Sequence, residues 1–211
     1  MKPQKKDKPI HEWPSILRQA GAEKVPVNIT VPEDVIIEPI SVSIETVSNI
    51  ECFRFTPSVP SKFTLFYLPG TACVAHFPSH TKAECANLAK NLECTVITIV
   101  HRTSQHSKYP VPINDVSMVI NHFLENSSKY KIDINKLGIG GYSAGALLSL
   151  QICLANLFQS KLPFRHILFV APVFSLEPEL YRDYSREKFI TAKFFARTAR
   201  EYLPKTIDPA T

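Results

Sequence analysis

The sequence predicts an α/β protein built on a mostly parallel, doubly wound sheet. Apolar segments typical of buried strands alternate with segments whose apolar residues recur at helical spacing, and two further strand-like segments precede this alternation. A glycine-rich strand–turn–helix motif lies within the alternation at residues 137–148. The chain of 211 residues is long enough for one sizeable domain of this class.

The individual elements follow from apolar spacing. Residues 63–68 are almost continuously apolar, as expected of a strand covered on both faces. Ile113, Val116, Ile120 and Phe123 recur at spacings of three and four, which predicts an amphipathic helix. The expected strands cover residues 35–47, 50–56, 63–68, 94–100, 137–142 and 167–170, and the expected helices cover residues 10–21, 81–92, 112–129 and 144–159.

Composition and charge are those of an ordinary globular protein. Apolar residues make up 45% of the chain and charged residues 20%, with a formal net charge of +5. Part of this charge is an N-terminal lysine cluster within residues 2–8, which we interpret as a solvated tail. The basic segment 186–200 carries phenylalanines that resemble a buried stripe rather than a base-stacking surface, so no nucleic-acid partner is expected.

The cysteines indicate neither disulfides nor a metal site. Their number is odd, most stand in apolar surroundings, and no spacing resembles a zinc ligand set, so we expect buried thiols, no metal and no cofactor. A lysine-rich N-terminus without a following apolar stretch predicts no signal peptide, and no apolar run is long enough to cross a membrane. The sequence therefore predicts a cytoplasmic protein, with secretion by a signal-independent route left open. The cysteines are Cys52, Cys73, Cys85, Cys94 and Cys153.

The glycines are concentrated where a catalytic turn is expected. The chain has only six glycines, and four of them lie between residues 138 and 145. Gly141-Tyr-Ser143-Ala-Gly145 fits the G-x-S-x-G nucleophile elbow, in which the serine occupies a strained turn between strand and helix. Such a turn directs the N–H of Ala144 and the helix N-terminus toward the anion formed during acyl attack. Ser143 is therefore a candidate nucleophile.

Two other interpretations of this motif are weaker. A dinucleotide-binding fingerprint would need glycine at the sixth position, where Ser143 stands, and an acidic residue about 20 positions later, where Lys161 and Arg165 stand. A chance glycine–serine turn is disfavoured because the motif lies between an apolar strand and an apolar helix.

The order of several motifs resembles the hormone-sensitive-lipase-like carboxylesterases, a branch of the α/β-hydrolases. A strand runs into Pro69-Gly-Thr-Ala72, where the family carries His-Gly-Gly-Gly. His101-Arg102, Tyr109-Pro110 and Asp115 then follow at matching spacing, before the elbow. We interpret Arg102 and Asp115 as a charged pair that ties a loop to the start of a helix.

The resemblance implies roles for individual residues. Ser143 matches the nucleophile, the N–H groups of Thr71, Ala72 and Ala144 match the oxyanion hole, and Gly70 belongs to the same loop. Gly141 and Gly145 are the elbow glycines. This chain departs from the family at Pro69, which replaces a histidine, at Tyr142, which replaces an acidic residue, and at Thr71 and Ala72, which replace glycines.

The resemblance also implies a domain organisation. Residues 1–33 would form an N-terminal tail with a cap-type helix, and residues 34–211 an α/β-hydrolase domain that lacks its last strands and helices. Within that domain, residues 173–203 are expected to form a helical segment associated with the cap. An incomplete sheet would leave an apolar edge uncovered, which predicts self-association or a completing polypeptide.

The triad acid and histidine cannot be assigned. In this fold both follow the serine in the chain, and only 68 residues come after Ser143. His166 is the only later histidine, and it begins a strand, at the end opposite the expected catalytic loops. His76 and His80 are weaker candidates that follow the oxyanion loop. The later aspartates, Asp183 and Asp208, are not assigned as the acid.

Three functions remain open from the sequence. In the first, the chain is a serine esterase acting on small to medium acyl esters, impaired by the missing acid and histidine. In the second, it is a catalytically inactive hydrolase relative that binds a ligand or partner. In the third, a second polypeptide supplies the missing acid and histidine.

Overall fold

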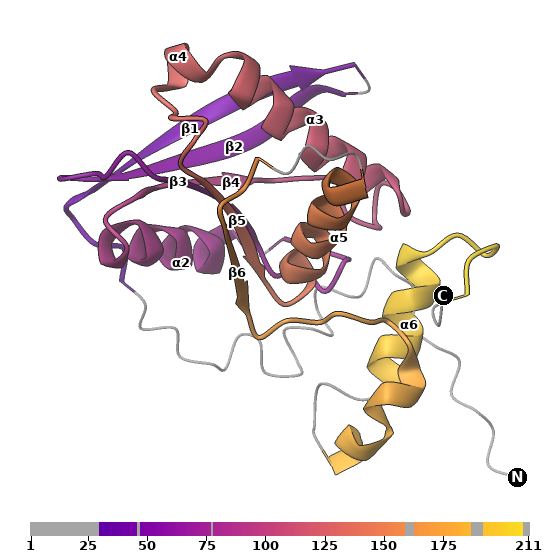
Figure 1. Ribbon diagram of the computed structural model, residues 1–211. Helices are drawn as coiled ribbons and strands as arrows, with labels where there is room; N and C mark the ends of the chain where they lie inside the picture. Colours follow the sequence, from indigo (N-terminus) through magenta and orange to yellow (C-terminus); the bar gives the residue numbers. More distant parts are fainter. Residues whose placement is uncertain (1–29, 46, 77, 159–162, 187–191, 209–211) are drawn as a thin grey trace, which may run out of the picture.

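The computed structural model describes residues 30–45, 47–76, 78–158, 163–186 and 192–208, and its centre is a six-stranded sheet (Figure 1). The strand order is β1-β2-β4-β3-β5-β6. The strands are β1 (Val35–Ile44), β2 (Val47–Pro57), β3 (Thr64–Leu68), β4 (Thr95–Ile99), β5 (Leu137–Tyr142) and β6 (His166–Val170). The helices are α2 (Pro78–Asn91), α3 (Val111–Glu125), α4 (Ser127–Tyr130), α5 (Ala144–Phe158), α6 (Ala192–Tyr202) and the 3-10 helix η3 (Pro178–Arg186).

The strand directions confirm the predicted fold class. Strand β2 is antiparallel to both β1 and β4, whereas β4, β3, β5 and β6 are mutually parallel. Each parallel connection in the described part of the chain crosses over through a helix, as parallel strands require. The result is a mostly parallel α/β sheet with an antiparallel margin.

Helices cover both faces of the sheet, and each face has its own apolar core. Small residues of α2 pack against Phe55 and Tyr67 on one face. On the other face, α3 and α5 pack against strand residues such as Phe66 and Ile97. Figure 1 shows α2 on the opposite side of the sheet from α3 and α5. Strand β5 is fully buried from residue 137 to residue 141, which explains its glycine-rich, uncharged sequence.

One predicted helix is interrupted. The apolar spacing predicts a helix over residues 112–129, but α3 ends at Glu125 and α4 begins at Ser127. At Asn126 the backbone leaves helical geometry, with φ −105° and ψ 27°, and the side-chain amide donates to the carbonyl of His122 at 2.8 Å. Asparagine side chains compete with the backbone for helical carbonyls, and this competition accounts for the break.

The segment expected to be cap-associated is also divided. The resemblance predicts one helical segment over residues 173–203, and in this range the structure has η3 followed by α6, with residues 187–191 outside the described residues. The ring of Tyr181 stacks on that of Phe195 at 3.4 Å between centroids, which joins the two helices. Phe195 and Tyr202 are buried in the main core. The predicted helix at residues 10–21 and most of the N-terminal tail lie outside the described residues.

Candidate active site

Ser143 lies at the tip of a sharp turn between β5 and α5. Its φ is +52°, a left-handed conformation that costs a non-glycine residue about 1–2 kcal/mol. The Ser143 N–H donates to the carbonyl of Val170 at 3.0 Å, and the side chain stays partly exposed. Strain of this kind persists only where the surroundings enforce it, and it occurs often at functional sites. This geometry matches the turn that the sequence leads us to expect for a candidate nucleophile at Ser143.

The two glycines that flank the turn are required by close backbone contacts. A Cβ on Gly145 would lie 2.1 Å from the carbonyl oxygen of Leu68, and one on Gly141 would lie 2.4 Å from the carbonyl carbon of Gly145. Both obstacles are backbone atoms, which cannot swing aside as a side chain can. The spacing of the motif therefore follows from how tightly α5 approaches the end of β3.

The loop after β3 packs directly against the elbow. A Cβ on Gly70 would lie 2.3 Å from the ring of Tyr142 and 3.3 Å from the Tyr142 carbonyl oxygen. The Tyr142 ring thus covers Gly70. This contact brings the loop at residues 69–75 to the same end of the sheet as Ser143.

The loop itself keeps a left-handed conformation although glycines are missing. Ala72 has φ +49° and Cys73 has φ +61°. The buried Thr71 stabilises this turn. Its hydroxyl accepts from the Cys73 N–H at 3.1 Å, and its carbonyl accepts from the N–H groups of Val74 and Ala75 at 2.9 and 3.0 Å. Threonine side-chain contacts therefore impose a geometry that glycine would permit freely.

The candidate oxyanion donors remain available. Within the described residues, the N–H groups of Ala72 and Ala144 donate to no protein acceptor. Ala144 is the first residue of α5, so its N–H belongs to the unsatisfied, partially positive end of the helix. Such donors stabilise an anion that develops next to the serine hydroxyl.

Two histidines near the loop connect it to its neighbour. His76 Nε2 lies 2.6 Å from the carbonyl oxygen of His101, and the two rings meet edge to face at 4.9 Å. Burial lowers the pKa of His101 to about 3, so its ring is neutral at physiological pH. Burial also lowers the pKa of His76. Hydrogen bonding to a backbone carbonyl commits His76 to holding the two loops together.

No triad is assembled among the described residues. None of the side-chain hydrogen bonds in that part of the chain joins the Ser143 hydroxyl to a histidine or a carboxylate. His80 is exposed near the start of α2. His166 pairs in register with Gly138, whereas the elbow end of β5 pairs Tyr142 with Val170, so His166 lies about 13 Å of strand away from that end.

Arg102 and Asp115 form the predicted charged pair. Asp115 is buried in α3, and its two carboxylate oxygens accept from Arg102 Nε at 2.8 Å and Nη2 at 2.5 Å. The pair fixes the loop after β4 to the first turns of α3, as expected.

Sequence patterns did not single out Tyr67, Glu84 or Lys108. Tyr67 on β3 donates its hydroxyl to Glu84 of α2 at 2.7 Å, and burial raises the pKa of that carboxyl group. Lys108 contacts the end of α6. Both contacts join segments that are distant in the chain, so no local spacing reveals them.

Within the residue ranges that the structure describes, no three His, Cys, Asp or Glu side chains are grouped so that they could hold a metal ion. None of the helices in those ranges combines the length and apolar content needed to cross a bilayer.

Comparison with known proteins agrees with the geometry. Residues 65–210 match the sequence model of a family described as alpha/beta hydrolase fold, and the chain belongs to that family. Curated acetyl esterases of Salmonella paratyphi B and Salmonella typhi are 32% and 31% identical to it over 101 residues. These matches cover 47% of this chain and 31% of each relative, so the chain spans only a part of their length.

Solved structures show the same fold. An esterase of Pyrobaculum calidifontis superposes with a TM-score of 0.83 at 17% identity, covering 97% of this chain and 68% of that one. A bacterial heroin esterase superposes with a TM-score of 0.76 at 16% identity, covering 92% of this chain and 62% of that one. An esterase from the bacterial hormone-sensitive lipase family superposes with a TM-score of 0.71 at 15% identity, covering 94% of this chain and 64% of that one. The predicted resemblance to hormone-sensitive-lipase-like carboxylesterases is confirmed.

Proposed function

We propose that this protein is a carboxylic ester hydrolase that uses Ser143 as its nucleophile on small to medium acyl esters. The observation that carries the proposal is the strained turn at Ser143, φ +52°, with the free N–H of Ala144 beside it. The acetyl esterase names of the curated relatives support a short acyl group.

The chemistry follows from the geometry of the site. The Ser143 oxygen attacks the ester carbonyl carbon, and negative charge develops on the carbonyl oxygen. The N–H groups of Thr71, Ala72 and Ala144 stabilise that charge. The C–O bond to the alcohol breaks, the alcohol leaves with a proton, and water hydrolyses the acyl-serine. A histidine and an acid would move the protons, and we propose that they come from polypeptide outside these 211 residues.

Without those partners the reaction is expected to be slow. The oxyanion donors and substrate binding alone supply on the order of 10³–10⁴-fold acceleration over water. We therefore expect weak hydrolysis by the 211-residue chain, together with measurable covalent capture of Ser143 by a reactive phosphonate.

Covalent labelling tests this proposal directly. A fluorophosphonate probe should label the wild-type protein and leave Ser143→Ala unlabelled, and hydrolysis of p-nitrophenyl acetate and butyrate should disappear in the same variant. Ser128→Ala, which changes an exposed serine of α4, is the matched control and should be labelled normally. Failure of the wild type to react would favour the alternative, a catalytically inactive relative that binds a ligand or partner.

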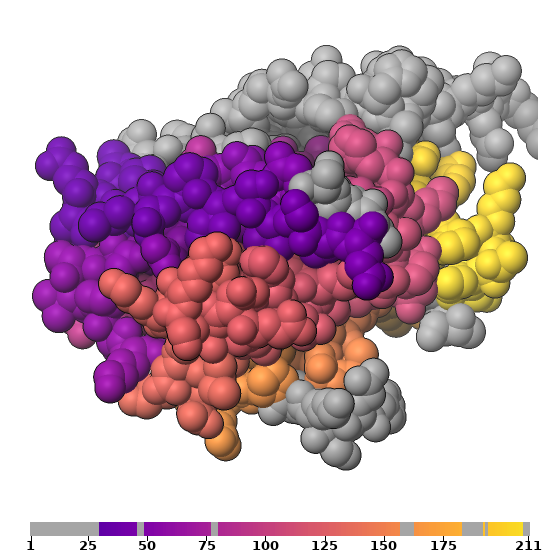
Figure 2. All heavy atoms as spheres, turned by 90° about the horizontal axis from the view of Figure 1, so that it is seen from above, coloured from indigo at the N-terminus to yellow at the C-terminus, as the bar shows by residue number. Residues whose placement is uncertain are grey.

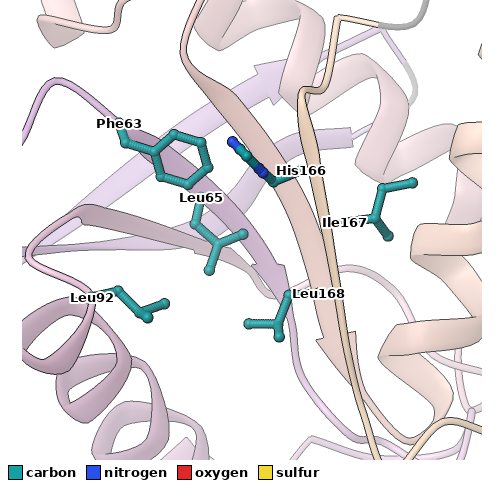
Figure 3. A pocket seen from close by; sticks show the side chains of 6 residues that line it. All are labelled: Phe63, Leu65, Leu92, His166, Ile167 and Leu168. Carbon is teal, nitrogen blue, oxygen red and sulfur yellow. The ribbon is translucent and has the colours of Figure 1, made fainter.

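The edge of the sheet supports a proposal about self-association. Within the described residues, β6 pairs only with β5, and each of its five residues is at least partly exposed. An open hollow of about 350 Å³ lies beside it, and its lining includes His166, which pairs with Gly138 toward the end of β5 away from Ser143 (Figure 3). In Figure 3 Leu168 points into this hollow and Ile167 to the other side of β6. The hollow is lined by Phe63, Leu65, Leu92, His166, Ile167 and Leu168.

We propose that the purified chain covers this apolar edge with a second copy of itself. Light scattering should then show a concentration-dependent dimer that Leu168→Lys weakens, whereas Ile134→Lys, at an exposed site that does not line the hollow, should leave the dimer unchanged. A monomer at every concentration would contradict self-association and favour a completing polypeptide.

The cysteines support a separate proposal about location. Those of the described residues are free and buried, which supports a reducing, cytoplasmic location.

A further inference from the structure

Lys108 binds the C-terminal end of α6. Its ammonium lies 2.8 Å from the carbonyl oxygens of Arg200 and Glu201 and 3.2 Å from that of Leu203. The last carbonyls of a helix have no intrahelical donor and carry partial negative charge, and a lysine offers three donors. One side chain therefore satisfies much of this helix end, across 92 residues of sequence.

The neighbouring residue extends the same contact. The Tyr109 N–H donates to the carbonyl of Tyr202 at 2.9 Å, and the two rings meet at 6.1 Å between centroids. Tyr202 is 1% exposed and packs in the same core as Cys73. Figure 2 shows the yellow C-terminal segment lying beside the pink part of the chain that includes this loop. The end of α6 is thus docked on the loop that follows β4.

The other side of that loop holds the candidate oxyanion loop. The Ser104 N–H donates to the carbonyl of Cys73 at 3.0 Å, and the His101 carbonyl accepts from His76 at 2.6 Å. Residues 101–109 therefore contact α6 on one side and residues 73–76 on the other.

The candidate oxyanion loop needs such support. Ala72 and Cys73 both have positive φ, and each such residue costs about 1–2 kcal/mol, so the conformation persists only where the surroundings enforce it. Tyr202 of α6 lies close enough to Cys73 for the two ionisable groups to interact electrostatically, and the Ser104 N–H holds the Cys73 carbonyl from the loop side.

We propose that Lys108 is a positioning residue that couples the docking of α6 to the geometry of the oxyanion loop. When the ammonium is absent, the end of α6 loosens, Tyr202 withdraws from Cys73, and Ala72 leaves the conformation that presents its N–H. Lys108 thereby lets a helix beside the site control the anion-stabilising donors. The kinetic part of this inference rests on the proposed function, whereas the structural part does not.

The test compares Lys108→Met, Lys108→Arg and the control Lys205→Met, which changes an exposed lysine beyond α6. Amide hydrogen exchange should rise in Lys108→Met both in α6 and in residues 71–76. The maximal rate of fluorophosphonate labelling should fall about two- to fivefold, the range expected for one surface cation at a helix C-terminus, with little change in probe affinity. Lys108→Arg should restore both, and Lys205→Met should resemble wild type.

Other outcomes separate the possibilities. Faster exchange confined to α6 would overturn the proposal, because Lys108 would then be a helix cap without influence on the loop. If wild type does not react with the probe, the proposed function fails, and exchange in residues 71–76 still decides the coupling. Should Lys108→Met not fold, Lys108→Gln, which keeps a polar side chain, carries the same comparison.

Discussion

Gly145 approaches Leu68 so closely that a Cβ at this position would lie 2.1 Å from the Leu68 carbonyl oxygen. This contact joins the helix behind Ser143 to the strand that leads into the candidate oxyanion loop. A backbone-to-backbone contact therefore joins the two halves of the site, in addition to the contact between Gly70 and Tyr142.

Substitution of Gly145 by alanine should disrupt this contact. Gly145→Ala must displace backbone, so we expect it to lower the free energy of unfolding by about 3 kcal/mol or more, at the upper end for overpacking. In the control Gly138→Ala the new Cβ meets mainly the ring of Phe63, at 2.7 Å, and that ring can shift. Urea unfolding should show the smaller loss for Gly138→Ala, and equal losses would contradict this interpretation.

Substitution of Ala72 by glycine should relieve strain. With φ +49°, Ala72→Gly should change the free energy of unfolding by less than about 1 kcal/mol in either direction, because relief of strain offsets the greater entropy of the unfolded chain. Ala75 is nearby and buried and lacks a positive φ, so Ala75→Gly should lower the free energy of unfolding by about 1 kcal/mol or more. Thermal unfolding of both variants measures the difference. A larger loss of stability in Ala72→Gly would contradict this prediction. It would mean that packing of the Ala72 methyl group stabilises the fold by more than the strained backbone destabilises it.

The Arg102–Asp115 pair should contribute strongly to stability. Asp115 has a side chain only 1% exposed, so Asp115→Ala removes the partner of a charged group at the core margin and should cost about 2–4 kcal/mol. The exposed pair Arg182–Glu179 provides a control, because Arg182→Met should change stability by less than about 1 kcal/mol. Chemical unfolding at neutral pH checks both values, and a small effect at Asp115 would show that the pair is dispensable.

Stability should depend on the protonation of His101. Its folded pKa of about 3 lies below the ordinary value near 6.5, so between these limits the unfolded chain binds the extra proton. The stabilisation is complete above about pH 6.5 and decreases as the pH falls toward 3, by up to about 1.4 kcal/mol per pH unit for this group.

Unfolding at pH 7.5 and pH 5 measures this dependence. His101→Asn should reduce the difference in the free energy of unfolding between the two pH values. His106→Asn, which changes an exposed histidine, should leave most of that difference in place. His76, whose pKa is also lowered by burial, accounts for part of any slope that remains in His101→Asn. An unchanged slope in His101→Asn would contradict the assignment.

Much of the fold was predictable because its strands, helices and the turn at Ser143 each have a recognisable local sequence pattern. Strand β5 and the start of α5 match the predicted residues, since a buried strand, a glycine-flanked serine and an apolar helix each leave a short-range signal. The break at Asn126 was missed because apolar spacing continues through it, and only a side-chain hydrogen bond decides it.

The sequence by itself determined the class of sheet, the elbow and the identity of the candidate nucleophile. The tertiary structure decided the rest: that Ala72 and Cys73 hold a left-handed turn without glycine, that His76 and His101 tie two loops together, and that Lys108 meets the end of α6. The physical reason is range. Strand, helix and turn patterns arise from neighbours in the chain, whereas these contacts join segments whose separation in sequence carries no periodic signal, so only packing can bring them together.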